Sequence, residues 1–171
     1  MALQPERWLT DPMASVVYIE TTILSYLTAE LSANLVIAGH QQVTHDWWAR
    51  HRSRFRLVAS AVVLREAGAG DPTMSRRRLA LLEGLPLLEI TEAALELAEG
   101  LVEAGIVPAK VFNDALHLAT ATVGRVDYLM TWNLAHLAGA QARRRIEREL
   151  RRRGFEPPTV CTPEELGASN D

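Results

Sequence analysis

Four polar side chains stand at the ends of short apolar runs or at the start of a helical segment, where catalytic groups of α/β proteins gather. They are Glu20 after the run 16–19, Glu66 beyond 57–59, Asp114 at the start of an alanine-rich segment, and Asn133 after 128–130. If the runs are neighbouring parallel strands, these side chains converge at one edge of a sheet. Carboxylates there suit Mg²⁺ or Mn²⁺, and a metal-activated water could attack a phosphodiester.

Each residue taken singly also has an ordinary structural interpretation. Glu20 fits a solvated residue before a helix cap, and Glu66 fits a solvated helix glutamate. Asp114 in a first helical turn would interact favourably with the helix dipole, and Asn133 is a common turn or cap residue. Only their joint placement after strands favours a functional site.

The elements that must position these residues alternate between strands and helices. Continuous apolar runs are typical of strands buried on both faces of a parallel sheet. Strands are predicted at 16–20, 55–59, 87–90, 128–131 and 159–161; helices at 33–51, 60–69, 73–84, 92–104, 111–124 and 141–153. The fold class is therefore α/β, with a central, mostly parallel five-stranded sheet flanked by helices.

Local signals set several helix boundaries. Thr91 followed by Glu92 predicts a helix start, and Gly105 predicts its end. The helix 141–153 has a narrow apolar stripe flanked by arginine, so we expect it on the surface, ending at Gly154.

Length and composition indicate one globular domain. The chain has 171 residues, 48% of them hydrophobic, which is enough for a real core. We expect an irregular lead-in over 1–15, the domain over 16–166 and a short tail over 167–171. A lone Cys161 and the lack of an apolar run of about 20 residues favour the cytoplasm and no membrane span.

Basic residues are concentrated although the net charge is −3. All but one of the 18 basic residues are arginine, with clusters at 50–56, 76–78 and 143–153. An RNA substrate needs phosphate contacts, which arginine makes in bidentate fashion, and the candidate segments are those around Arg52 and over 143–153. The alternative for 143–153 is a solvated face in which arginines pair with Glu147 and Glu149.

Two further features have competing interpretations. Trp47 and Trp48 could stack on bases, but neighbouring helix residues point in different directions, so core or dimer packing is favoured. His117 shares a helix face with Asp114 and could bond a carboxylate; a satisfied, partly buried histidine is favoured over a metal ligand. The other histidines show no zinc-site spacing.

The segments that carry the four polar residues resemble the motifs of PIN-domain proteins, the ribonucleases typified by VapC toxins. The segment 17–22 (Val-Tyr-Ile-Glu-Thr-Thr) resembles the opening strand, and 60–66 the second motif. Residues 113–121 (Asn-Asp-Ala-Leu-His-Leu-Ala-Thr-Ala) are similar to the third motif, and 129–133 (Leu-Met-Thr-Trp-Asn) to the fourth. The resemblance covers residues 16 to 161.

The resemblance implies a Mg²⁺- or Mn²⁺-dependent endoribonuclease, the toxin of a type II toxin–antitoxin pair with a small antitoxin partner, and a homodimer. It implies Glu20 and Asp114 as principal metal ligands and Glu66 as a further ligand, directly or through water. Thr22 and Thr131 would be supporting hydroxyls, and Asn133 would complete the catalytic set.

Two positions depart from the family pattern. Glu20 stands where aspartate is usual, and Asn133 stands where aspartate is common. Three carboxylates instead of four should bind a second metal less readily. A second hypothesis is therefore a PIN-like RNA-binding or protein-interaction module with weakened catalysis.

Overall fold

The computed structural model describes residues 14–168, so the predicted lead-in and tail lie largely outside the described residues. Five strands form one sheet in the order β3-β2-β1-β4-β5, and every pairing is parallel. They are β1 (Val16–Ile19), β2 (Arg56–Ser60), β3 (Leu87–Leu88), β4 (Tyr128–Met130) and β5 (Thr159–Cys161). The predicted α/β fold with a five-stranded sheet is confirmed.

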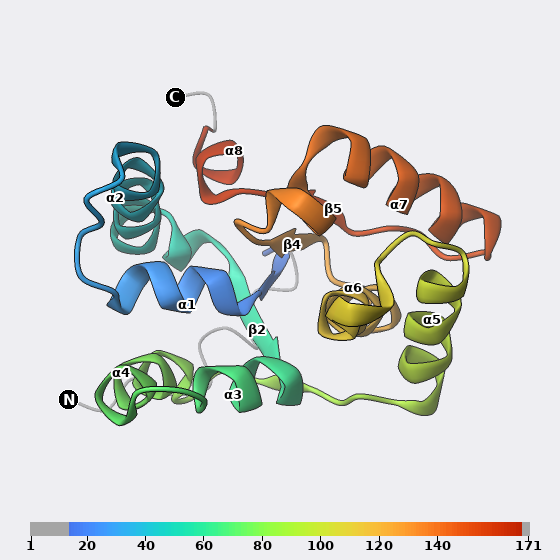
Figure 1. Ribbon diagram of the computed structural model, residues 1–171, viewed down its shortest axis with the longest axis horizontal. Coiled ribbons are helices and arrows are strands. Elements are labelled where there is room, and N and C mark those ends of the chain that lie inside the picture. Colours follow the sequence, from blue (N-terminus) through green and yellow to red (C-terminus); the bar gives the residue numbers. More distant parts are fainter. Residues whose placement is uncertain (1–13, 169–171) are drawn as a thin grey trace.

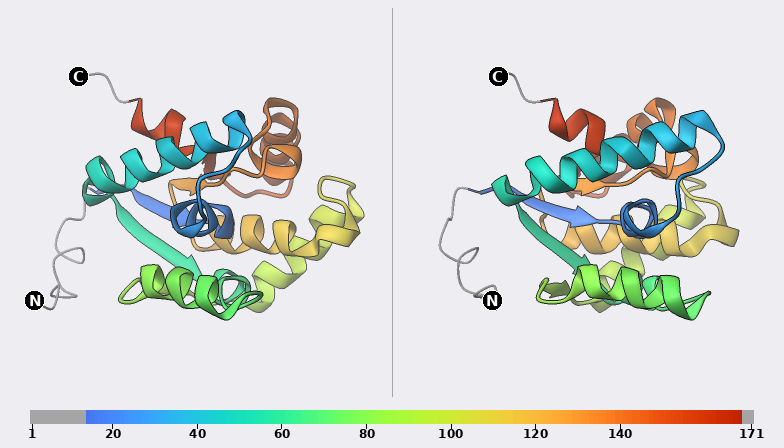
Figure 2. Two further views of the ribbon diagram at one scale, coloured as in Figure 1. Left: turned by 60° about the vertical axis from the view of Figure 1, so that its left-hand side comes forward. Right: turned by 90° about the vertical axis from the view of Figure 1, so that its left-hand side faces the viewer.

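The helices cover both faces of the sheet. Figure 1 shows α1, α2 and α4 on one side of the strands and α5, α6 and α7 on the other, and Figure 2 shows the same layers from two further directions. The helices are α1 (Thr21–Thr28), α2 (Leu35–Arg50), α3 (Ala61–Ala67), α4 (Pro72–Leu82), α5 (Glu92–Glu103), α6 (Phe112–Val123), α7 (Ala140–Arg152) and α8 (Pro163–Gly167). Short turns η1 (Arg52–Arg54), η2 (Ala109–Val111) and η3 (Leu134–Ala138) connect them.

The order of the strands creates a switch point between β1 and β4. From β1 the chain moves through α1 and α2 to β2, whereas from β4 it moves through α7 to β5 on the opposite side. The register aligns Tyr18 with Leu129 and Ile19 with Met130. Connections leave the two strands in opposite directions at their carboxyl ends, which is where open α/β sheets bind ligands.

The core is built by the apolar runs that predicted the strands. Val17, Tyr18 and Ile19 of β1 are fully buried, as are Leu129 and Met130 of β4. Strands covered by helices on both faces need apolar side chains at successive positions, which explains why these runs do not alternate.

Helix ends follow the sequence signals. The Thr91 side chain accepts a hydrogen bond from the Ala94 N–H and so caps α5. Gly105 and Gly154 follow α5 and α7 with φ of +67° and +83°, a conformation that glycine adopts without steric cost.

The elements that were not predicted from the sequence are helices α1 and α8 and the short turns η1, η2 and η3. Of the tryptophan pair, Trp47 is buried in the core and packs on Phe55 with ring centroids 5.7 Å apart, as core packing predicted. Within residues 14–168, no helix is both long and apolar enough to cross a membrane.

Leu129→Ala tests how much the buried packing of β4 contributes to stability. The fully buried side chain leaves a cavity when it is truncated, so we expect a loss of about 2–5 kcal/mol in the free energy of unfolding. Urea unfolding measures it. The matched control is Leu95→Ala, at a side chain that is 41% exposed, which should cost far less. Equal losses in the two variants would contradict the packing described.

Candidate metal centre at the carboxyl edge of the sheet

Glu20 sits at the carboxyl end of β1 and is itself the N-cap of α1. Its Oε2 atom accepts hydrogen bonds from the Thr22 N–H at 3.1 Å, the Thr22 hydroxyl at 2.5 Å and the Thr131 hydroxyl at 2.7 Å. The side chain is only 5% exposed, so the solvated interpretation does not hold. All three bonds fall on Oε2, which leaves Oε1 as the oxygen that can turn to a cation.

Glu66 approaches the same point from α3. Its Oε2 accepts from the Thr21 hydroxyl and from the His117 Nε2 at 2.9 Å, while Oε1 accepts from the Asn113 amide at 2.7 Å. A carboxylate offers about four lone-pair positions, so one remains on Oε1 for a metal or a bound water. Burial would raise the pKa of Glu66, but the hydrogen bond and charge of His117, with the bonds from Thr21 and Asn113, outweigh it and set the pKa at about 2.

His117 lies where the two carboxylates meet. Ligand atoms of Glu20, Glu66 and His117 all lie within 4.8 Å of one another, a spacing that suits a single cation. The ring is 1% exposed and both of its nitrogens have partners, so the satisfied buried histidine is confirmed. Its place three residues after Asp114 was the signal that it faces the carboxylates.

A buried polar chain orients His117. The Ser60 and Tyr18 hydroxyls lie 2.7 Å apart, and the Tyr18 hydroxyl lies 2.7 Å from His117 Nδ1. Since ionised Glu66 only accepts, His117 Nε2 must carry a hydrogen, and in the neutral ring Nδ1 then accepts from Tyr18. Burial raises the pKa of Tyr18, despite its hydrogen bond with Ser60, and the charges of Glu20 and Glu66 raise it further, so the phenol keeps its proton.

Asp114 and Asn133 form the second part of the site. Asp114 is half-buried in the first turn of α6 and lines, together with Glu66, a cavity of about 430 Å³. Burial raises the pKa of Asp114, while a hydrogen bond with Asn133 and the charges of His136 and His117 oppose that rise. Asp114 lies outside the compact set of Glu20, Glu66 and His117.

The β4 loop is held in place by aromatic and hydroxyl contacts. Asn133 caps η3 by accepting from the His136 N–H at 3.1 Å, which is the structural role expected of an asparagine there. The Trp132 N–H donates to the Thr22 hydroxyl at 2.9 Å, and the indole N–H donates to Thr44 at 2.8 Å. His40 stacks on the Trp132 ring with centroids 4.0 Å apart. The loop therefore delivers Thr131 to Glu20 in a fixed position.

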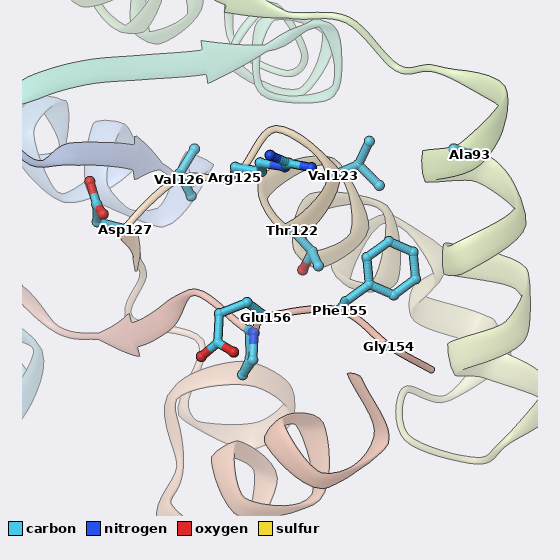
Figure 3. Close-up of a pocket in the computed structure, with 10 residues that line it drawn as sticks. Ala93, Thr122, Val123, Arg125, Val126, Asp127, Gly154, Phe155 and Glu156 are labelled. Carbon is cyan, nitrogen blue, oxygen red and sulfur yellow. The ribbon is translucent and has the colours of Figure 1, made fainter. Parts of the chain in front are cut away.

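A larger cavity, of about 770 Å³, lies at the opposite edge of the sheet (Figure 3). Its lining includes Asp127 and Glu156, which precede β4 and β5, and Arg125. Asp127 has a structural task, since its carboxylate accepts from the Val16 N–H at 2.7 Å. This cavity lacks the convergence of carboxylates found at the carboxyl edge.

The four predicted residues are thus placed in two adjoining groups. Glu20 and Glu66 meet directly, with Thr22 and Thr131 on the Glu20 carboxylate. Asp114 shares a cavity with Glu66 and interacts with Asn133. The donors Thr21, Asn113, Tyr18 and Ser60 were not predicted, although Thr21 and Asn113 directly follow or precede motif acids.

Comparison with solved structures shows the fold. A chain of the VapBC2 complex of Rickettsia felis, bound to a DNA fragment from its promoter, matches with a TM-score of 0.54 and 15% identity over 86% of this chain and 98% of that one. A chain of a toxin–antitoxin complex from Klebsiella pneumoniae matches with a TM-score of 0.51 and 19% identity over 74% and 93%. The PIN/VapC-type fold expected from the motifs is confirmed.

No protein-family model matches the sequence. No curated protein matches it either.

Tyr18→Phe tests the buried polar chain. The substitution keeps the ring and removes only the hydroxyl between Ser60 and His117, so two buried polar groups lose a partner. We expect a loss of about 1–3 kcal/mol in the free energy of unfolding, measured in urea. Tyr26→Phe is the control, because Tyr26 is half-buried and stacks on Trp132 through its ring. A Tyr18→Phe variant as stable as the parent would sink the assignment.

Proposed function

We propose that this protein is a metal-dependent endoribonuclease that hydrolyses RNA phosphodiester bonds as the toxin of a type II toxin–antitoxin pair. The observation that carries the proposal is the convergence of Glu20, Glu66 and His117 within 4.8 Å at the switch point of the sheet. The VapC-type fold and the four sequence motifs support it. A small antitoxin partner, a homodimer and a cytoplasmic location belong to the same proposal.

The residues present fit a hard divalent cation. Glu20 offers its Oε1 atom, Glu66 the remaining lone pair of Oε1, and Asp114 a carboxylate on the shared cavity. We assign Mg²⁺ or Mn²⁺, because the donors that remain available are carboxylate oxygens. When bound, the cation supplies an activated water and charge stabilisation at the phosphate.

The chain's own residues fix the geometry of that centre. Thr22 and Thr131 hold the Glu20 carboxylate in one orientation, and His117 does so for Glu66. Asn133 contributes a hydrogen bond that keeps Asp114 closer to its ionised form. Substrate, metal and product must enter over the cavity beside Glu66 and Asp114, where Lys110 also lines the wall.

Asp114→Asn tests the proposed activity. The amide keeps the size of the side chain but removes one negative charge, so we expect Mn²⁺ affinity to fall and RNA cleavage to drop by about 10²-fold or more. Calorimetry measures the first and cleavage of labelled single-stranded and structured RNA the second, with an EDTA control. The matched variant is Asp46→Asn on α2, which should cleave RNA as the parent does. Metal binding that is unchanged in Asp114→Asn would contradict the assignment.

The pH dependence of metal binding follows from the raised pKa of Asp114. A cation competes with the proton on a carboxylate, so affinity should fall as the pH drops through that pKa. Glu66, with a pKa of about 2, stays ionised over the same range. Mn²⁺ titrations at several pH values should show this loss in the parent and a flatter profile in Asp114→Asn. If both proteins show the same pH profile, the proton that competes with Mn²⁺ binds to a group other than Asp114.

A further inference from the structure

Helix α7 and its C-cap residue Arg153 carry seven arginines, and the structure divides them into two groups. One group is engaged with neighbouring parts of the fold. Arg143 binds Glu165 at 2.8 Å, Arg145 donates to the Gly105 carbonyl, and Arg152 and Arg153 bind the buried Glu149 at 2.6 and 2.7 Å. These contacts anchor the helix and hold the pKa of Glu149 at about 2, with the Arg152 and Arg153 hydrogen bonds as the main cause.

The other group, Arg144, Arg148 and Arg151, forms what we call the arginine row. The three residues are exposed and lie at i, i+4 and i+7, so they share one face of α7, opposite the buried Ile146 and Leu150. Among residues 14–168, their one carboxylate contact is Arg151 with Glu156 at 3.7 Å, between side chains that are 61% and 86% exposed. Such a pair contributes little, so the row keeps most of its positive charge.

The expected pairing with glutamate does not neutralise this face. Glu149 turns inward and is used by Arg152 and Arg153, and Glu147 forms no salt bridge within the described part of the chain. Glu147 still lies beside Arg144 and Arg151 at helical spacing, so the charges cancel in part, and the three arginines outnumber Glu147 and Glu156 on this face. The chain as a whole has a net charge of −3, so three guanidinium groups on one face form a local positive patch. Such a patch attracts a polyanion to that face.

The helix that carries the row begins at the same edge of the sheet as the candidate metal centre. Asn133 caps η3 at the carboxyl edge of β4, and α7 starts at Ala140 directly after that turn. Because β4 and β5 are parallel, α7 must run back along the sheet from this edge, on the outer side of the molecule seen in Figure 1. From Arg144 to Arg151 the row spans about 10 Å along the helix, comparable to the distance between phosphates one or two nucleotides apart.

We infer that the arginine row binds the phosphodiester backbone of single-stranded RNA on one side of the cleaved bond. This inference rests on the proposed nuclease function and adds where the substrate lies. Guanidinium groups bind phosphates in bidentate fashion and read no sequence, so the row anchors the strand and leaves sequence preference to other contacts.

The test is RNA binding by the triple variant Arg144→Gln, Arg148→Gln, Arg151→Gln. Binding of a fluorescein-labelled 20-nucleotide RNA is measured by anisotropy in EDTA, between about 50 and 200 mM salt. We expect affinity to fall about tenfold or more and the slope of log K against log salt to fall by about 2, since each lost phosphate contact contributes roughly 0.7. The control removes the same charge from exposed arginines outside the two candidate segments, with Arg76→Gln, Arg77→Gln and Arg125→Gln, and should keep the parent's slope.

A second measurement separates this inference from the nuclease proposal. A dinucleotide carries only the phosphodiester that is cleaved and no flanking phosphate for the row, so the triple variant should cleave it at the parent's rate in Mn²⁺ while cleaving the 20-nucleotide RNA more slowly at low concentration. If the salt slope is unchanged in the triple variant, or if the control loses as much affinity, the arginine row does not bind RNA, even if cleavage is intact. A parent that binds RNA through the row but cleaves nothing would instead overturn the nuclease proposal and leave the row supported.

Discussion

Crowded carboxylates at one edge of the sheet are the constraint on which the rest of the structure depends. Like charges in a partly buried site repel one another and raise each other's pKa unless donors surround them. Here Glu20 and Glu66 each accept three hydrogen bonds, from β4, α1 and α6. These hydrogen bonds stabilise the ionised carboxylates, and they also hold the elements together at the switch point.

The site is continuous with the core through a single polar path. Ser60 at the end of β2, Tyr18 inside β1, His117 on α6 and Glu66 on α3 are linked in sequence by hydrogen bonds. Buried polar groups are costly unless every one is satisfied, so this path restricts how the strands and helices can shift. The orientation of the Glu66 carboxylate therefore depends on how the core packs around Tyr18 and His117.

The sequence predicted most of the architecture because buried parallel strands need unbroken apolar runs, and each of the five runs became a strand. It missed α1 because eight residues are too few for a clear helical period, and η3 because a single π-helical turn has no periodic signal. Glu20 and Glu66 were expected to meet since both follow strands. Neither Asn113, which donates to Glu66, nor Tyr18, which bonds to His117, could be identified, because which side chains meet depends on the packing of α6 against the sheet.

Glu20 and Asn133, the two residues that depart from the PIN motifs, each make contacts that suit the residue present. The longer Glu20 side chain lets one oxygen take bonds from Thr22 and Thr131 while the other stays available. A fourth carboxylate at position 133 would raise the pKa of Asp114 still further, whereas the Asn133 amide lowers it by hydrogen bonding. Asparagine therefore favours an ionised Asp114 in a site that already holds Glu20 and Glu66. The lower total charge is also the reason to expect one cation rather than two under the proposed function.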